Sequence, residues 1–171
     1  MLQNNTALGS GALTAADGTM LDANQAVTLG NAVTLGGALT IAGSNDLDLT
    51  NLVSGSGSLV KNGTADLTLA GANTYQGGTS VGGGTLTLGN GAALGSGALN
   101  VTGASSLATS TPLSLANAIN LGADLTLPGT SNLVLNGVIG GSSGLVKNGS
   151  ASLTLNGNNT YQGSTSLASG T

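Results

Sequence analysis

The sequence LVKNGTADLTLAGANTYQGG at residues 59–78 recurs almost unchanged at residues 145–164 as LVKNGSASLTLNGNNTYQGS. A second element, ALGSGAL, occurs at residues 7–13 and again at residues 93–99, with the same offset of 86 residues. No gap is needed to align the two halves of the chain. A fixed internal period of this kind is the signature of repeat architectures.

The offset divides residues 1–171, which we take as one continuous domain, into copies 1–86 and 87–171 of a single unit. Residue 1 then matches residue 87, and residue 171 matches residue 85. Both ends are therefore expected to be cuts through a longer array. No apolar run reaches about 18 residues, so no transmembrane helix is predicted, and an export signal is expected to lie outside this stretch.

A shorter period runs inside the long one, in the form of apolar-polar-apolar triplets. They occur at residues 47–49, 67–69 and 86–88, and again at 133–135 and 153–155, so the starts of neighbouring triplets within each of these two groups differ by 19 or 20. Alternation with period 2 predicts strands, and the Asn-Gly pairs between the triplets predict tight turns. Four turns in each unit would average about 21 residues, a coil length typical of a β-solenoid.

A propeller would need blades of about 40–45 residues with aromatic signatures, and a sandwich needs no regular internal repeat. We therefore predict an all-β parallel β-solenoid of about eight coils without notable helices, in which Leu stacks on Leu along a rod of roughly 38 Å.

The composition excludes several classes of function. The chain has 31 Gly, two Lys, two Tyr and neither His nor Cys, with a formal net charge of −4. Triads and zinc sites that need His or Cys cannot form. Two Lys cannot neutralise a nucleic-acid backbone, and no Gly-Lys-Ser or Gly-Lys-Thr phosphate loop is present.

Asp46, Asp48 and Asp66 form the one carboxylate cluster that the sequence suggests. A solvated outer face is the main interpretation. A weak Ca²⁺ site and a polysaccharide-cutting pair of carboxylates are the alternatives. The second copy replaces all three, with Asn132, Val134 and Ser152. The cluster is therefore not part of the repeated design.

Lys61 matches Lys147, and Tyr75 matches Tyr161. Each Lys is interpreted as a turn residue that keeps a sheet edge soluble, with a periodic contact to an anionic partner as the alternative. Each Tyr is expected to cover a corner of its coil and to leave its hydroxyl in water. Alternatively, the two Tyr are contact anchors four coils, or roughly 19 Å, apart.

Residues 59–86 and 145–171 resemble the autotransporter passenger-associated β-strand repeat, in which Leu, Lys, Gly, Asn and Tyr recur at these spacings. Ala65, Ala151 and Ser164 depart from its usual Gly. The resemblance implies a right-handed parallel β-helix. It also implies a Gram-negative surface protein exported through the inner membrane and then through its own outer-membrane β-barrel. It supplies no catalytic residues and no cofactor.

The predicted function is a non-catalytic shaft of an extracellular passenger on the bacterial surface, supporting adhesion, biofilm formation or self-assembly. The alternatives are a polysaccharide-acting enzyme domain and a module that binds glycans, ice or other copies of itself. Ice binding is disfavoured because Thr85-Leu86-Thr87 has no matching neighbours. Expected partners are further copies, end to end or side by side, and host-cell or biofilm surfaces, but not nucleic acid.

Overall fold

The computed structural model describes residues 1–43 and 45–171, and it consists of short parallel strands joined by turns. The strands are β1 (Leu13–Ala15), β2 (Thr19–Leu21), β3 (Val27–Leu29), β4 (Val33–Leu35), β5 (Leu39–Ile41), β6 (Leu47–Leu49), β7 (Val53–Gly55), β8 (Leu59–Lys61), β9 (Leu67–Leu69), β10 (Thr79–Val81), β11 (Thr85–Leu88), β12 (Leu99–Val101), β13 (Ser105–Thr109), β14 (Leu113–Leu115), β15 (Ile119–Leu121), β16 (Leu125–Leu127), β17 (Leu133–Leu135), β18 (Ile139–Gly141), β19 (Leu145–Lys147), β20 (Leu153–Leu155) and β21 (Thr165–Leu167).

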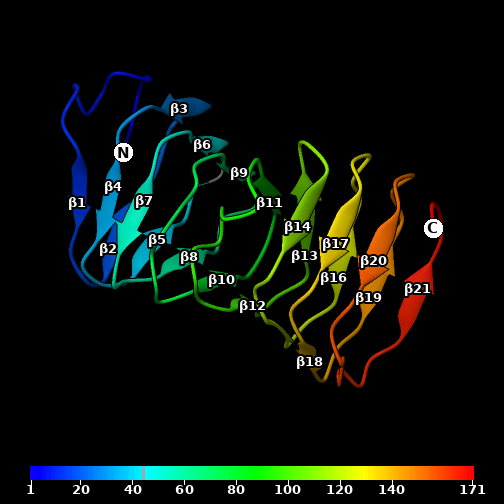
Figure 1. The fold of residues 1–171 in the computed structure, drawn as a ribbon. Coiled ribbons are helices and arrows are strands. Elements are labelled where there is room, and N and C mark those ends of the chain that lie inside the picture. The colour runs from blue at the N-terminus through cyan, green and yellow to red at the C-terminus, as the bar shows by residue number, and fades with distance from the viewer. Residues whose placement is uncertain (44) are drawn as a thin grey trace.

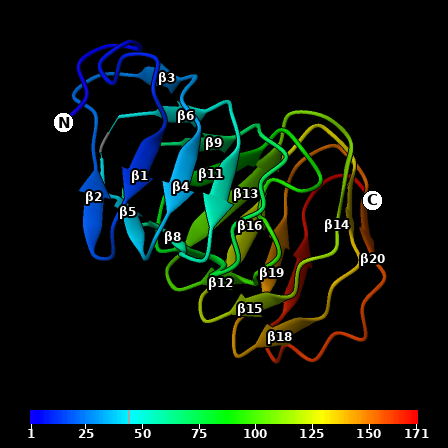
Figure 2. The same ribbon diagram turned by 60° about the vertical axis from the view of Figure 1, so that its left-hand side comes forward.

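The chain winds into a three-sided solenoid of about eight turns, with its two ends at opposite ends of the stack (Figures 1 and 2). One side is a seven-strand sheet in the order β18-β15-β12-β10-β8-β5-β2. A second side is an eight-strand sheet in the order β21-β19-β16-β13-β11-β9-β6-β3. The third side holds two three-strand sheets, β1-β4-β7 and β14-β17-β20. The predicted all-β solenoid is thus confirmed, and none of the described residues forms a helix.

The third side continues between its two sheets through irregular backbone. Thr74 N donates to Val53 O at 2.9 Å, and Ser96 N donates to Tyr75 O at 3.0 Å. Residues 73–76 and 92–96 therefore occupy the strand positions of two coils without a regular ladder. The described part of the chain contains no helix long and apolar enough to span a membrane.

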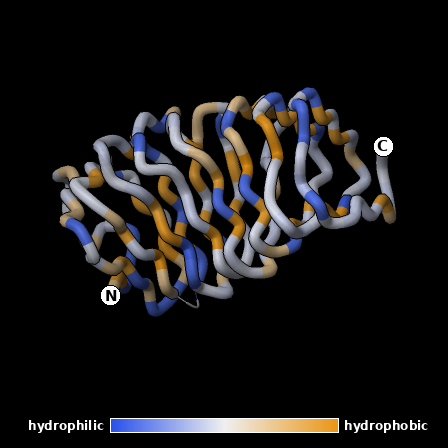
Figure 3. The backbone as a smooth tube through the Cα atoms, turned by 90° about the horizontal axis from the view of Figure 1, so that it is seen from below, coloured by the Kyte–Doolittle hydropathy of each residue, from blue (hydrophilic) through white to orange (hydrophobic). Residues whose placement is uncertain are grey.

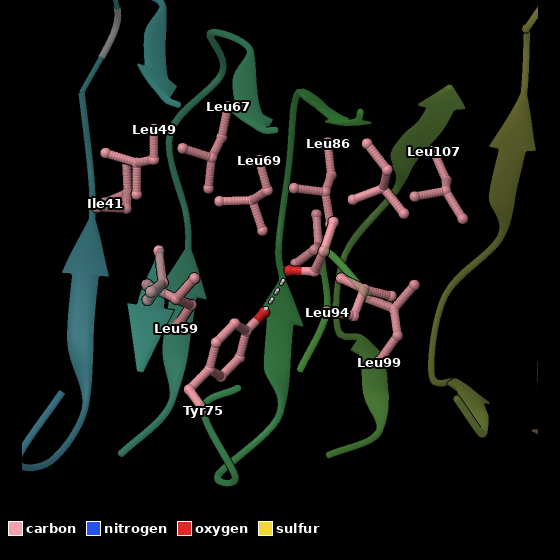
Figure 4. Packing of buried hydrophobic residues seen from close by; sticks show 14 of the residues in the cluster. Ile41, Leu49, Leu59, Leu67, Leu69, Tyr75, Leu86, Leu94, Leu99 and Leu107 are labelled. Carbon is pink, nitrogen blue, oxygen red and sulfur yellow. Dashed lines mark hydrogen bonds between the residues drawn. The ribbon is translucent and has the colours of Figure 1, made fainter. Parts of the chain in front are cut away.

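Stacked aliphatic side chains fill the interior. Neighbouring coils pair Leu13 with Val33 and Val33 with Val53, so paired positions differ by 20 in number. The central residue of a typical strand points outward and its two flanking residues point inward, as in the buried-exposed-buried pattern of β3. Figure 3 shows this as a regular pattern of apolar segments along the tube, and Figure 4 shows Leu67 and Leu86, which are partners in neighbouring coils, in the core. Burial of this aliphatic row is the main force that holds coil to coil.

The two copies of the 86-residue unit are rotated relative to each other. Lys61 ends β8 in the seven-strand sheet, whereas Lys147 ends β19 in the eight-strand sheet. Paired positions in neighbouring coils mostly differ by 20 in residue number. An offset of 86 residues therefore equals four full coils and about one of the three sides of a fifth. The expectation that four turns would fill the unit evenly was wrong, and matched residues such as Tyr75 and Tyr161 do not lie on the same side of the rod.

Candidate functional site

The side chains that define the repeated motif point into the solenoid, and Lys61 shows this most clearly. Its exposed fraction is 1%. Its Nζ donates hydrogen bonds to Gly63 O at 2.8 Å, Ala65 O at 2.5 Å and Gly83 O at 2.9 Å. An ammonium has three donors, and here each has a carbonyl acceptor. Lys61 therefore ties the corner after β8 to the corner of the next coil.

The surroundings of Lys61 disfavour its charge. Burial lowers the pKa of Lys61 below its ordinary value, because the desolvated ammonium loses hydration. The carboxylates of Asp66 and, to a lesser extent, Asp46 act in the opposite direction and partly restore the pKa. The two acidic groups thus serve as a weak counter-charge for the buried Lys61.

Lys147 repeats this arrangement in the second copy. It is also buried, with an exposed fraction of 4%. Its Nζ donates to Gly149 O, and to Ser169 O at 3.3 Å. The sequence-based interpretation of both Lys as solvent-facing turn residues or as contacts for an anionic partner is therefore corrected. The aliphatic stem reaches inward, and backbone carbonyls take the place of water around the ammonium.

A glycine lies close to each buried Lys ammonium and leaves space for it. Gly84 has a positive φ of 64°, and a Cβ there would lie 2.6 Å from Lys61 Nζ. Gly170 has a φ of 77°, and a Cβ there would lie 2.6 Å from Lys147 Nζ. Atoms that are not bonded do not approach this closely, so only glycine leaves room for the ammonium. The Lys and the Gly of the motif are thus two halves of one contact.

Tyr75 is wholly buried, with an exposed fraction of 0%. Its hydroxyl shares a hydrogen bond of 2.5 Å with Thr79 Oγ1, drawn as a dashed line in Figure 4. Burial raises the pKa of Tyr75 to about 12, and the hydrogen bond to Thr79 offsets part of that rise. The expectation that this hydroxyl would be wet was wrong. Tyr161 makes the matching hydrogen bond to Thr165 at 2.6 Å but is only half-buried.

Asparagine side chains form further links between coils. Asn73 is 4% exposed; its Oδ1 accepts from Val53 N at 2.8 Å and its Nδ2 donates to Ala93 O at 2.7 Å. Its counterpart Asn159 accepts from Ile139 N at 2.9 Å. Asn73 satisfies polar backbone atoms on both neighbouring coils, where the irregular third side has no ladder to do so.

Asn31 and Asn117 are the matched pair that sequence reasoning missed. Asn31 Nδ2 donates to Gly9 O at 3.0 Å and to Gly11 O at 2.6 Å. Asn117 Nδ2 donates to Gly95 O at 3.0 Å and to Gly97 O at 2.8 Å. The signal was present in the sequence, because each Asn follows the Gly-Ser-Gly that it binds by the same interval, one coil along the chain.

The three Asp lie on the outside of the solenoid, spread over two neighbouring coils. Asp46 and Asp66 are exposed, and Asp66 N donates to Asp46 Oδ1 at 2.9 Å. Asp48 is half-buried, and its Oδ2 accepts from Thr28 Oγ1 at 3.1 Å. Within residues 1–43 and 45–171, no group of three acidic, His or Cys side chains is arranged to hold a metal ion.

Two small hollows mark the described surface. One, of about 10 Å³, has room for about one water and is lined by Thr109, Ser131 and Lys147 among others. The other is a groove of about 170 Å³ between β1 and β2, lined by Leu13, Met20 and their neighbours. Neither hollow is lined by an Asp, so Asp46, Asp48 and Asp66 do not lie in either of them.

The comparison with protein families agrees with the geometry. A family model described as the passenger-associated-transport-repeat matches residues 59–88 and 145–171. These stretches contain Lys61, Tyr75 and Gly84 in the first copy, and Lys147, Tyr161 and Gly170 in the second. A search of the curated proteins and a search of the solved structures each found no match. Fold and repeat together fit an autotransporter passenger segment, and the chain is thus a β-solenoid with two stretches that match the passenger-associated-transport-repeat.

Proposed function

We propose that this chain is a non-catalytic shaft segment of a passenger protein that is exported and displayed on the bacterial surface. In this role it holds other parts of the passenger away from the membrane and supports adhesion, biofilm formation or self-assembly. The outer-membrane β-barrel of the parent protein is the expected route of export.

One observation carries the proposal: three polar residues that the repeat preserves, Lys61, Asn73 and Tyr75, are bonded inside the solenoid. Lys61, Asn73 and Tyr75 are 1%, 4% and 0% exposed, and their polar atoms bond to backbone or to Thr79. Side chains kept for binding or catalysis have to reach a ligand. Side chains kept for stacking coils do not have to reach a ligand. We assign Lys61, Asn73 and Tyr75 to this stacking role.

The composition suits export as well. A chain with no Cys forms no disulfide that would block threading. Each coil contacts mainly its neighbours, so folding can spread from coil to coil as the chain emerges. Such a segment gains length by adding coils, without any change to the others.

A display experiment tests the proposal. The 171-residue chain is placed between an epitope tag and an outer-membrane β-barrel in a Gram-negative host. We expect the tag to bind antibody on intact cells and the solenoid to resist added protease. As a matched control, Gly84→Val with Gly170→Val, which forces a side chain against each buried Lys, should give a protease-sensitive passenger.

Two results would contradict the proposal. One is failure of the unaltered chain to appear on the surface while the same barrel displays an unrelated β-solenoid. The other is release of reducing ends from a polysaccharide by the purified chain, with loss of that activity in Asp46→Asn/Asp48→Asn/Asp66→Asn. The second result would place the enzyme alternative first.

A further inference from the structure

The two copies differ in the charges that surround their buried Lys, and this difference points to an ion site in the second copy. In the first copy, the carboxylates of Asp66 and Asp46 act against burial to raise the pKa of Lys61. The matching positions in the second copy are Ser152 and Asn132, which carry no charge. The weak counter-charge of the first copy therefore has no equivalent at these positions in the second.

The backbone at these positions is nevertheless linked in the same way in both copies. Asp66 N donates to Asp46 Oδ1 at 2.9 Å. Ser152 N donates to Asn132 Oδ1 at 3.0 Å. The second copy thus keeps the hydrogen bond between the coils and loses only the negative charges. Its ammonium, on Lys147, is 4% exposed, and a buried ammonium without a counter-charge is costly because little water remains to solvate it.

The one acidic residue of the second copy, Asp124, lies away from this ammonium. Asp124 comes directly before β16 and accepts a hydrogen bond from Gly144 N at 2.8 Å. Lys147 is the last residue of β19 and pairs with Leu127, the last residue of β16. Asp124 and Lys147 are therefore at opposite ends of two paired strands, and Asp124 does not replace the missing carboxylates.

The hollow of about 10 Å³ lies beside the buried ammonium group's side chain. Lys147 lines this hollow together with the hydroxyl-bearing residues Thr109, Ser131 and Ser152. Thr109 is buried, whereas Ser131 and Ser152 are half-buried and give a small solute a way in from the solvent. The remaining lining residues are Leu107, Leu127, Gly129, Leu133 and Leu153.

The hollow arises where a row of leucines gives way to smaller residues. Leu69 pairs with Leu88, and Leu88 pairs with Thr109. A Cβ at Gly129 would lie 4.0 Å from Thr109 N, and a Cβ at Gly149 would meet Gly129 O, so these positions continue the same row. The bordering strands β13, β16 and β19 each lie between two other strands of the eight-strand sheet, so the hollow is formed within the stack.

We propose that this hollow binds one halide ion, such as chloride. Lys147 supplies the positive charge, and the O–H groups of Thr109, Ser131 and Ser152 supply hydrogen bonds to the ion. The ion takes the part that two carboxylates play in the first copy. The inference concerns one contact between coils and does not depend on export or display, so it can fail separately from the proposed function.

Size and charge favour a halide over other occupants. A hollow of this volume admits about one water, so phosphate and sulfate are too large for it. A water would satisfy the hydroxyls but would leave the charge of Lys147 without a counter-charge. Every residue in the lining is either neutral or, in the case of Lys147, positively charged, so the described part of the hollow contains no group that repels an anion.

Bromide replaces chloride in the crystallographic test because it scatters anomalously. Crystals of the 171-residue chain are grown in sodium bromide and measured at the bromine absorption edge. We expect an anomalous peak in the hollow, within hydrogen-bond distance of Lys147 Nζ and of at least one of the three hydroxyls.

Thermal unfolding tests binding in solution. Sodium chloride is exchanged for sodium gluconate at constant ionic strength, because gluconate is too large for the hollow. We expect the melting temperature to rise by about 3–6 °C for each tenfold increase in chloride above its dissociation constant, since a ligand that binds the folded chain stabilises it.

Matched variants locate the effect. Ser152→Asp restores in the second copy the carboxylate of Asp66, which the first copy already accommodates, and should abolish both the chloride dependence and the bromide peak. Asn120→Asp adds the same charge on the exposed middle of β15 and should change neither. Thr109→Val removes one hydroxyl without a change of size and should weaken chloride binding about tenfold, as expected for a hydrogen bond to an ion.

Three results would overturn the inference. The first is an equal melting temperature in chloride and in gluconate. The second is a chloride-dependent rise that persists in Ser152→Asp and Thr109→Val, which would place the ion elsewhere. The third is an anomalous map with bromide at surface sites only.

Discussion

Lys61 and Tyr75 in the first copy match Lys147 and Tyr161 in the second, yet the two pairs have different surroundings. Tyr75 is enclosed and has an exposed fraction of 0%, whereas Tyr161 is half-buried. Leu67 and Leu69 of β9 are fully buried, whereas their counterparts Leu153 and Leu155 of β20 are half-buried. The local hydrogen bonds of the two copies are nevertheless alike, from Tyr to Thr and from Lys to backbone.

Some hydrogen bonds form within a single coil, whereas the burial of its side chains depends on the next coil. The hydrogen bond between Tyr161 and Thr165 forms within one coil and needs no neighbour. The burial of Tyr75 needs the following coil, because Ala93 O of that coil lies 3.5 Å from the Tyr75 hydroxyl and Ser96 N donates to Tyr75 O at 3.0 Å. In a solenoid, stability therefore resides in the interfaces between coils more than in the coils.

The largest expected difference between the copies concerns the aromatic ring. Tyr75→Ala should lower the free energy of unfolding by about 3–5 kcal/mol, as for other large buried side chains. Tyr161→Ala should lower it by only about 1 kcal/mol, because the Tyr161 ring is already partly in contact with water. Urea titrations of the two variants measure this. Equal losses would mean that the following coil does not cover Tyr75.

The next effect is a loss of stability at alkaline pH. The pKa of Tyr75 is raised to about 12 in the folded chain, while a Tyr in the unfolded chain titrates near 10. Between these values the unfolded chain loses its phenol proton and the folded chain retains it. The stabilisation is therefore complete below about pH 10 and falls by about 3 kcal/mol as the pH rises to about 12.

Urea titrations at a series of pH values, compared between variants, isolate this effect. Tyr75→Phe should remove the loss that is specific to Tyr75. Tyr161→Phe keeps Tyr75 and should retain it. If Tyr75→Phe leaves the profile unaltered, the hydroxyl is in water and the close contact with Thr79 is wrong.

A smaller effect is expected at Lys61. Lys61→Met fills the same space but leaves the carbonyls of Gly63, Ala65 and Gly83 without their donor, which should cost about 1–3 kcal/mol. Lys147→Met removes a donor from two carbonyls and should cost less. Thermal unfolding of both variants near neutral pH gives the comparison. Wild-type stability in both would mean that the ammonium groups lie in water.

Lys61 also predicts a pH dependence of its own. Its pKa is lowered in the folded chain, so the unfolded chain binds the proton more tightly. Stability should therefore rise with pH from the lowered pKa up to the ordinary value of about 10.4. Lys61→Met should remove this rise, and a rise that persists in the variant would assign it to another group.

The smallest effect is expected on the outer face. Asp46→Asn/Asp48→Asn/Asp66→Asn should change the free energy of unfolding by less than about 0.5 kcal/mol per site, as for ordinary surface positions. Excess calcium chloride should leave the melting temperature of the unaltered chain unchanged. A calcium-dependent rise that the triple variant lacks would establish the metal site that we consider the weaker interpretation.

Much of the fold could be predicted because its signals are local and repeated. The triplets of β6 at residues 47–49 and β9 at residues 67–69 both alternate with period 2. The two strands are neighbours in register, with Leu47 beside Leu67. The apolar side chains at the first and third positions of each triplet have to point inward, so most of the core could be predicted from the sequence.

The rotation of the copies could have been predicted but was not. The interval of 20 between triplets was visible in the sequence, and 86 is not a multiple of 20. We divided the 86 residues into four equal turns, and this division overlooked the residues beyond four coils of 20, which form about one further side of the solenoid. As a result, the alternative interpretation of Tyr75 and Tyr161 as contact anchors placed them four whole coils apart.

The burial of Lys61 had no such local signal. A Lys beside Asn-Gly is typical of an exposed turn, because an ammonium is costly to bury. Here three carbonyls converge on it, one from Gly83 in the next coil. Acceptors brought together by coil stacking are a property of the fold, and the sequence around Lys61 does not contain them.

A crystal structure of this 171-residue chain, refined well enough to place Lys61 and Lys147, tests the account most directly. The account predicts both ammonium groups inside the solenoid, bonded to backbone carbonyls. It also predicts Lys61 in the seven-strand sheet and Lys147 in the eight-strand sheet, as the register between coils requires. Both Lys in solvent, aligned on one side of the rod with four coils between them, would contradict it.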